Sequence, residues 1–74
     1  MQSEQLQLDV QMAKSSLEVS IAQTKLDLSK AEVKLSEAKR AVPYSIQEEL
    51  NAYKEVTALK KGLEYAEKVL LERF

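Results

Sequence analysis

Apolar residues recur at every third or fourth position from Leu6 to Val42, a pattern that predicts a long amphipathic helix. Placed on a helix at about 100° per residue, these residues form two stripes and not one. The main stripe, with Thr24 as its only polar member, contains Leu6, Val10, Ala13, Leu17, Ile21, Leu28, Ala31, Leu35, Ala38 and Val42. The second stripe lies on roughly the opposite side and contains Leu8, Met12, Val19, Ala22, Leu26 and Val33. A helix that is apolar on two faces needs two packing partners, and a chain this short supplies only one of them.

The main stripe is interrupted at Pro43, whose ring disfavours a helical conformation at the preceding Val42. Ser45 and Glu48 then have the spacing of a capping box, in which each side chain satisfies the backbone amide of the other. A second amphipathic helix is therefore expected to start just after Ser45. Its main face collects Ile46, Leu50, Tyr53, Val56, Leu59, Leu63, Ala66, Leu70 and Phe74.

A connection of two or three residues between two long helices is typical of an antiparallel hairpin. At about 1.5 Å per residue the first helix is ~55 Å long and the second ~40 Å, so about two amino-terminal turns of the first extend beyond the second. We predict a single all-α domain, an antiparallel two-helix coiled-coil hairpin over residues 1–74, with helix 1 at about 4–42, a turn at 43–45 and helix 2 at about 46–73.

The length of 74 residues limits how much core this hairpin can have. A chain of this size buries only about 60% of its unfolded surface and is marginally stable alone. The sequence has no Cys and no His, so neither a disulfide nor a common zinc site adds stability. Association is the remaining means of stabilising a small scaffold. We expect assembly into a helical bundle, with a homodimeric four-helix bundle as the simplest closed arrangement.

The composition argues against catalysis and against several classes of ligand. Besides lacking His and Cys, the sequence has no Gly-rich phosphate loop, nucleophile elbow or acidic calcium loop. We therefore expect no enzyme activity, no cofactor and no metal site. The 11 Lys and Arg residues are interleaved with 12 Asp and Glu, so we expect no nucleic-acid partner. The longest apolar run is Val69–Leu71, far too short to span a membrane, and we expect a cytoplasmic protein.

Two surfaces are candidate partner-binding sites. The first is the second stripe of helix 1, because six apolar positions in consistent register form a larger patch than monomers usually expose. The second is a face of helix 2 with Ala58, Gly62, Tyr65 and Val69. Gly62 inside a helix costs about 1 kcal/mol relative to Ala. A closely approaching helix explains this glycine, and a tolerated glycine without function explains it equally well.

These surfaces predict a non-catalytic protein–protein interaction module, such as an adaptor, chaperone subunit or assembly factor, that binds by helix–helix packing. Its partner is either another protein or a second copy in a homodimer, and the second stripe of helix 1 carries the contact. An alternative is a self-associating structural coiled coil without a foreign partner. RNA binding would require assembly to gather lysines that are scattered on one chain.

The turn and the second helix also carry a family resemblance. The hairpin has Pro43-Tyr44 at its turn and the run Ala58-Leu59-Lys60-Lys61-Gly62-Leu63 in helix 2. In both features it resembles the small co-chaperones of type III secretion needle subunits, some of which contain an Ala-Leu-x-x-Gly-Leu stretch. The resemblance covers the architecture of most of the chain, but matching residues only in this segment. It implies pairing with a larger helical-repeat chaperone to keep a needle protein unpolymerised, through the second stripe and the Gly62 face.

Overall fold

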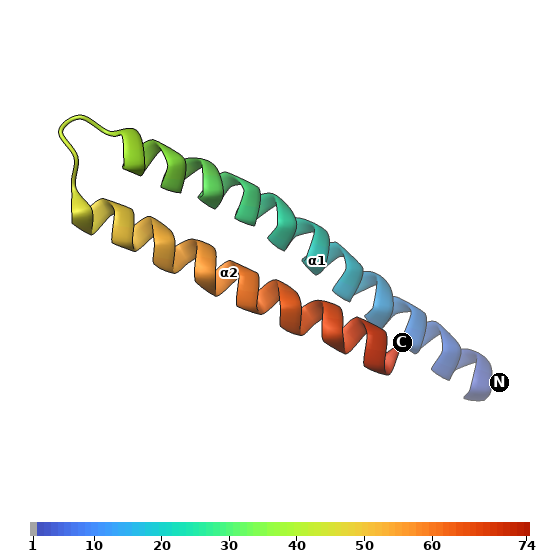
Figure 1. The fold of residues 1–74 in the computed structure, drawn as a ribbon. Coiled ribbons are helices and arrows are strands. Elements are labelled where there is room, and N and C mark those ends of the chain that lie inside the picture. The colour runs from blue at the N-terminus through green and yellow to red at the C-terminus, as the bar shows by residue number, and fades with distance from the viewer. Residues whose placement is uncertain (1) are drawn as a thin grey trace.

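The computed structural model describes residues 2–74, with side chains from residue 6 onward, and contains two helices. Helix α1 (Gln2–Arg40) and helix α2 (Ile46–Arg73) run antiparallel and are joined by a short connection (Figure 1). The two helices contact each other along the length of α2. The predicted all-α helical hairpin is confirmed for the described part of the chain.

The connection starts two residues earlier than predicted. Helix α1 ends at Arg40, and the amide of Ala41 donates to the carbonyl of Ala38 at 3.4 Å in a final tightened turn. Val42, expected on the main stripe, is almost fully exposed because the residue before a proline is pushed out of the helical region. At the other end of the connection, Ser45 has extended backbone angles and its hydroxyl accepts from the Glu48 amide at 3.4 Å. This N-cap places the start of α2 where the sequence predicted it.

A seam of half-buried and buried side chains joins the two helices. On both helices its members are spaced alternately three and four residues apart, as in a coiled coil. The deepest are Ile21, Ala31 and Val56, at 7%, 2% and 5% exposure. The seam contains Leu17, Ile21, Thr24, Leu28, Ala31, Leu35 and Ala38 from α1, and Ala52, Val56, Leu59, Leu63, Ala66 and Leu70 from α2.

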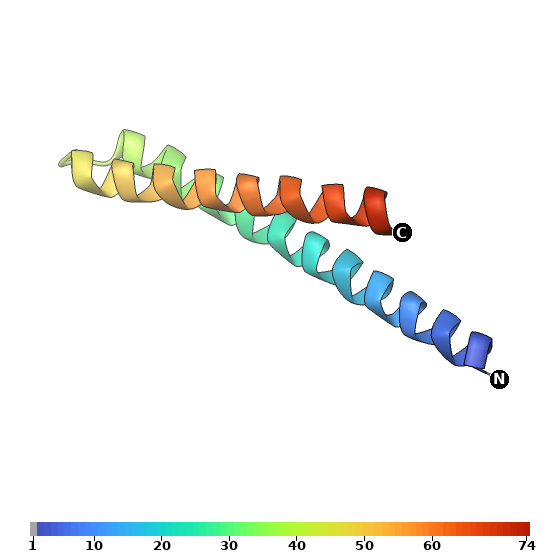
Figure 2. The same cartoon turned by 90° about the horizontal axis from the view of Figure 1, so that it is seen from below.

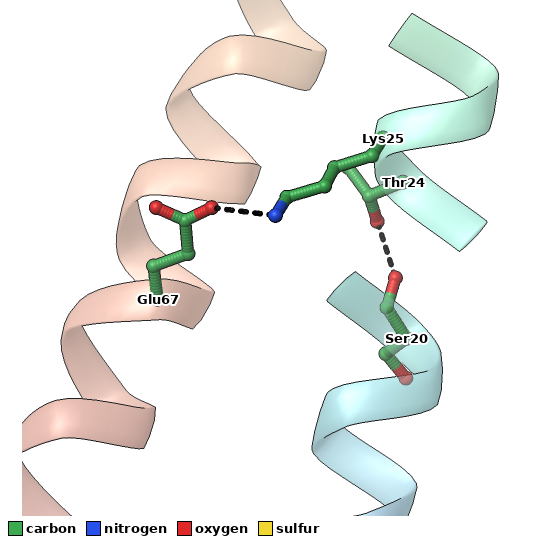
Figure 3. A network of polar contacts seen from close by, with 4 residues as sticks. All are labelled: Ser20, Thr24, Lys25 and Glu67. Atoms are coloured by element: carbon green, nitrogen blue, oxygen red, sulfur yellow. Dashed lines mark hydrogen bonds and ion pairs between the residues drawn. The ribbon is translucent and has the colours of Figure 1, made fainter. Parts of the chain in front are cut away.

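Polar groups adjoin this seam in two ways, and Figure 3 shows both. The hydroxyl of Thr24 donates to the carbonyl of Ser20 at 2.8 Å, so its polar atom is satisfied within α1. The Lys25 ammonium lies 3.7 Å from the Glu67 carboxylate across the helices. Both side chains are about half exposed or more, so this pair contributes only about 0–1 kcal/mol. The apolar seam therefore has to supply most of the attraction between the helices.

The first turns of α2 differ from the sequence prediction. Ile46, Leu50 and Tyr53 were expected to face α1, yet all three are exposed, Leu50 least at 45%. The seam passes instead through Ala52, four residues before Val56. The predicted stripe through Leu50, Tyr53 and Val56 to Leu59 would take three successive three-residue steps, whereas Ala52 preserves the regular alternation of threes and fours. Three large apolar side chains consequently remain on the surface.

Helix α1 extends well beyond the end of α2, as Figures 1 and 2 show from two directions. Residues 6–16 are all exposed, including the main-stripe members Leu6, Val10 and Ala13. This overhang of about three turns is longer than the two predicted. Phe74, expected on the main face of α2, closes the shorter helix and is also exposed. The molecule measures 64 × 16 × 13 Å.

Candidate partner-binding surfaces

The second stripe of α1 lies on the face that points away from α2. All six predicted members are exposed, and its five large side chains have exposures between 50% and 69%. The seam occupies the opposite side of the same helix, so the hairpin fold covers none of this stripe. From Leu8 to Val33 it extends about 38 Å along α1 at 1.5 Å per residue. The structure thus brings all six predicted residues together on one uncovered surface.

Two serines complete this surface. Ser15 and Ser29 occupy the gaps between its apolar members, and with them the spacing alternates strictly between four and three residues, which is a regular heptad. Both are exposed, and the Ser29 hydroxyl donates to the Lys25 carbonyl at 3.1 Å. A neighbouring helix can therefore cover Ser29 without leaving its hydroxyl unpaired. We name the outer stripe as Leu8, Met12, Ser15, Val19, Ala22, Leu26, Ser29 and Val33.

Apolarity alone missed the two serines, because it discards small polar residues. The regular spacing was the signal that could have found them.

Charged residues border the outer stripe on both edges. Asp9 and Lys30 lie along one edge, and Glu18 and Lys25 lie along the other. Such edge positions set the register between paired helices.

The second predicted surface lies on α2, and three of its four members are exposed. Ala58, Gly62 and Tyr65 are exposed, whereas Val69 is half-buried. A Cβ built at Gly62 would meet no heavy atom within 4 Å, so α1 does not approach this glycine. The hairpin therefore contains no close helix contact that explains Gly62. Any such contact would have to come from another chain.

A third apolar surface was not predicted. Near the connection, Ile46, Leu50 and Tyr53 have the spacing i, i+4 and i+7 and share one face of α2. Tyr44 is also exposed, and its hydroxyl donates to the Glu49 carboxylate. We name Tyr44, Ile46, Leu50 and Tyr53 the loop-end patch. Continuing the heptad backwards from Val56 to Ala52 would have shown that these residues face outward.

The hollows found on this surface are open grooves. One, at the loop end of the seam, is lined in part by Lys34, Ala38, Glu48 and Ala52. Among the described residues, no group of three or more acidic, His or Cys side chains is arranged to hold a metal ion. Neither helix, within that part of the chain, combines the length and apolarity needed to cross a membrane.

Comparisons with protein-family models, with curated proteins and with solved structures gave no match to this chain. The candidate surfaces therefore depend on the residues of the chain itself. Of the three, the outer stripe is the longest, with eight positions in one heptad register.

Proposed function

We propose that this chain is a non-catalytic protein–protein interaction module that binds through the outer stripe of α1. An adaptor, a chaperone subunit or an assembly factor would each use such a surface. One observation carries the proposal: apolar side chains continue in register over about 38 Å on the face of α1 that α2 does not cover. Monomers rarely expose a contiguous apolar surface of this extent. We further propose the cytoplasm as its location, in keeping with the lack of Cys.

The proposed mechanism is packing of a partner helix along α1. Apolar anchors such as Met12 and Leu26 supply affinity, because covering each removes apolar surface from water at about 25 cal/mol per Å². The charged edges supply register, because a misaligned partner brings like charges together. The binding energy also compensates for a hairpin core that contains only three buried side chains among residues 6–74.

A second candidate function is that of a co-chaperone resembling those of needle subunits. The open space around Gly62 favours it, since nothing in the chain itself uses that space. A foreign helix packed across Ala58 and Gly62 could approach the α2 backbone closely. In this case both α1 and α2 would contact foreign proteins.

Site-specific photo-cross-linking in the cells that produce this chain tests the proposal. A photoreactive residue at Leu26 should give cross-linked protein products several-fold above the same residue at Leu71. Leu71 is a suitable control because it is also an exposed leucine but lies outside the outer stripe. Equal, low yields at both positions would overturn the proposal. A third probe at Ala58 examines the second candidate, which requires a foreign protein at that position as well.

A further inference from the structure

We infer that the occupant of the outer stripe is a second copy of this chain, with the two α1 helices packed antiparallel in one defined register. This inference rests on the proposed function, because it names the partner of the same surface. Two properties of the stripe carry it: the alternation of large and small side chains, and the order of charges along its edges.

Side-chain size alternates along the stripe from Met12 to Val33. Met12, Val19, Leu26 and Val33 occupy one heptad position, whereas Leu8, Ser15, Ala22 and Ser29 occupy the other, in which Leu8 is the one large residue. In a parallel pair each position faces its own kind, so small residues would face small residues and leave voids in the packing. Reversing one helix brings the two kinds opposite each other. In three of the four kinds of layer a large residue then fills the space left by a small one, which favours an antiparallel pair.

Two-fold symmetry fixes which residues face each other. If one residue contacts a second across the axis, the second also contacts the first. The register that places Leu8 opposite Val33 of the other copy matches every member of the stripe with another member. The layers are Leu8 with Val33, Met12 with Ser29, Ser15 with Leu26, and Val19 with Ala22, each formed twice.

The charged edges select this register over its neighbours. In an antiparallel pair each edge faces the same edge of the other helix. The register then brings Asp9 beside Lys30 on one edge and Glu18 beside Lys25 on the other, again twice each. All four contacts join opposite charges. Lys25 already pairs with Glu67 in its own chain, but its side chain is 61% exposed and its ammonium has three donors to share.

Sliding the helices by one heptad in either direction reverses this advantage. One shift brings Glu18 beside Glu18 of the other copy. The other shift brings Lys25 beside Lys25 and places Leu8 opposite Arg40. Like charges held side by side weaken association, and a guanidinium facing a leucine leaves an apolar layer incomplete. Of these three registers, only the one centred between Val19 and Ala22 avoids both faults.

This dimer differs from the four-helix bundle expected from the sequence. Because the outer stripe points away from α2, the helices follow the order α2, α1, α1 and α2 in a layer, and they do not surround a common core. The overhang of each α1, residues 6–16, lies along the part of the other α1 that α2 supports from behind. Each copy thus covers the unsupported end of the other.

Disulfide trapping with the purified full chain tests the register directly. The chain contains no Cys, so every disulfide that forms must join the introduced cysteines. A mixture of Leu8→Cys and Val33→Cys chains in a glutathione buffer should yield mainly the mixed disulfide dimer, with little from either variant alone. A parallel pair would instead link each variant to itself. A shifted register would link Leu8→Cys to Leu26→Cys or to Arg40→Cys. Either result overturns the inference.

Charge reversal provides a second measurement. Glu18→Lys should weaken the dimer by about tenfold in sedimentation equilibrium, because two attractive contacts become repulsive. Adding Lys25→Glu together with Glu67→Lys, which keeps opposite charges at positions 25 and 67 of the hairpin, should restore most of the affinity. A triple variant no tighter than the single variant would contradict the register.

The outcomes also separate this inference from the proposed function. A wild-type chain that is monomeric at high concentration, yet cross-links through Leu26 to a foreign protein in cells, overturns the inference and leaves the interaction module standing. A monomeric chain without any product at Leu26 overturns both.

Discussion

Ile21 and Val56 are the only large side chains buried in the described part of the hairpin, and Ala31 between them is small. Burying an aliphatic side chain of that size contributes about 1.5–3 kcal/mol. Fixing the backbone of one residue costs about 1–2 kcal/mol. Two such side chains therefore offset the ordering of only a few residues. The stability of the hairpin therefore depends on the half-buried side chains of the seam and on any partner that covers the exposed apolar side chains.

Gly62 offers a prediction at the scale of one residue. Gly62→Ala should stabilise the isolated chain by about 1 kcal/mol, because no described glycine has positive φ and the space around its Cβ position is empty. Chemical denaturation of the two proteins measures the difference. Ala58→Gly on the same face is the matched control and should destabilise by a similar amount. A loss of stability in Gly62→Ala would mean that another chain already packs against this glycine.

At the scale of the helix, the rotation of α2 about its axis decides which side chains are covered. Ala52 faces α1 in the structure, although size and hydrophobicity would favour Leu50 and Tyr53 for that position. Ala38 and Ala41 line the same groove as Ala52, so small residues from both helices meet at this end. The larger side chains of the loop-end patch point away from that contact. This leaves α2 with an exposed apolar face at its amino-terminal end.

Two substitutions compare these faces. Ala52→Asp should destabilise the hairpin by about 1–2 kcal/mol more than Leu50→Asp, because only the former places a charge against α1. Both introduce the same residue two positions apart, so differences in helix propensity are small by comparison. Urea unfolding followed by circular dichroism gives both values. The opposite ranking would indicate that Leu50 packs against α1, as the sequence predicted.

The sequence predicted the hairpin because its signals are local. Pro43 ends a stripe, and Ser45 caps the next helix through an amide three residues away. The outer stripe was also predictable, since its apolar members keep one period. The rotation of α2 was missed, because the prediction followed the large apolar residues Leu50 and Tyr53 and not the regular spacing that leads back to Ala52. Ser15 and Ser29 were missed because their role comes from small size and regular spacing, which a hydrophobic pattern ignores.

At the scale of the whole molecule, the elongated shape limits the stability of one chain. The radius of gyration is 17.7 Å, whereas a compact chain of this length has about 11 Å. An elongated hairpin exposes more surface per residue than a globular domain does. A pair of hairpins joined along the outer stripe would reduce that exposed surface.

Thermal unfolding should therefore depend on protein concentration. The midpoint of wild-type unfolding should rise by several degrees from about 5 to about 500 µM, because association stabilises the folded state by mass action. Leu26→Asp should remove this dependence by placing a charge in the centre of the stripe. Leu71→Asp should retain it. A wild-type midpoint that does not change over this range would argue against self-association.

The overhang of α1 has a consequence for how any complex forms. Residues 6–16 receive no packing from α2, so unwinding them in the free chain costs little free energy. When a partner binds there, the binding energy must offset the conformational entropy that these residues lose on becoming helical. The association rate then depends on the fraction of chains in which these three turns are helical when the two molecules collide.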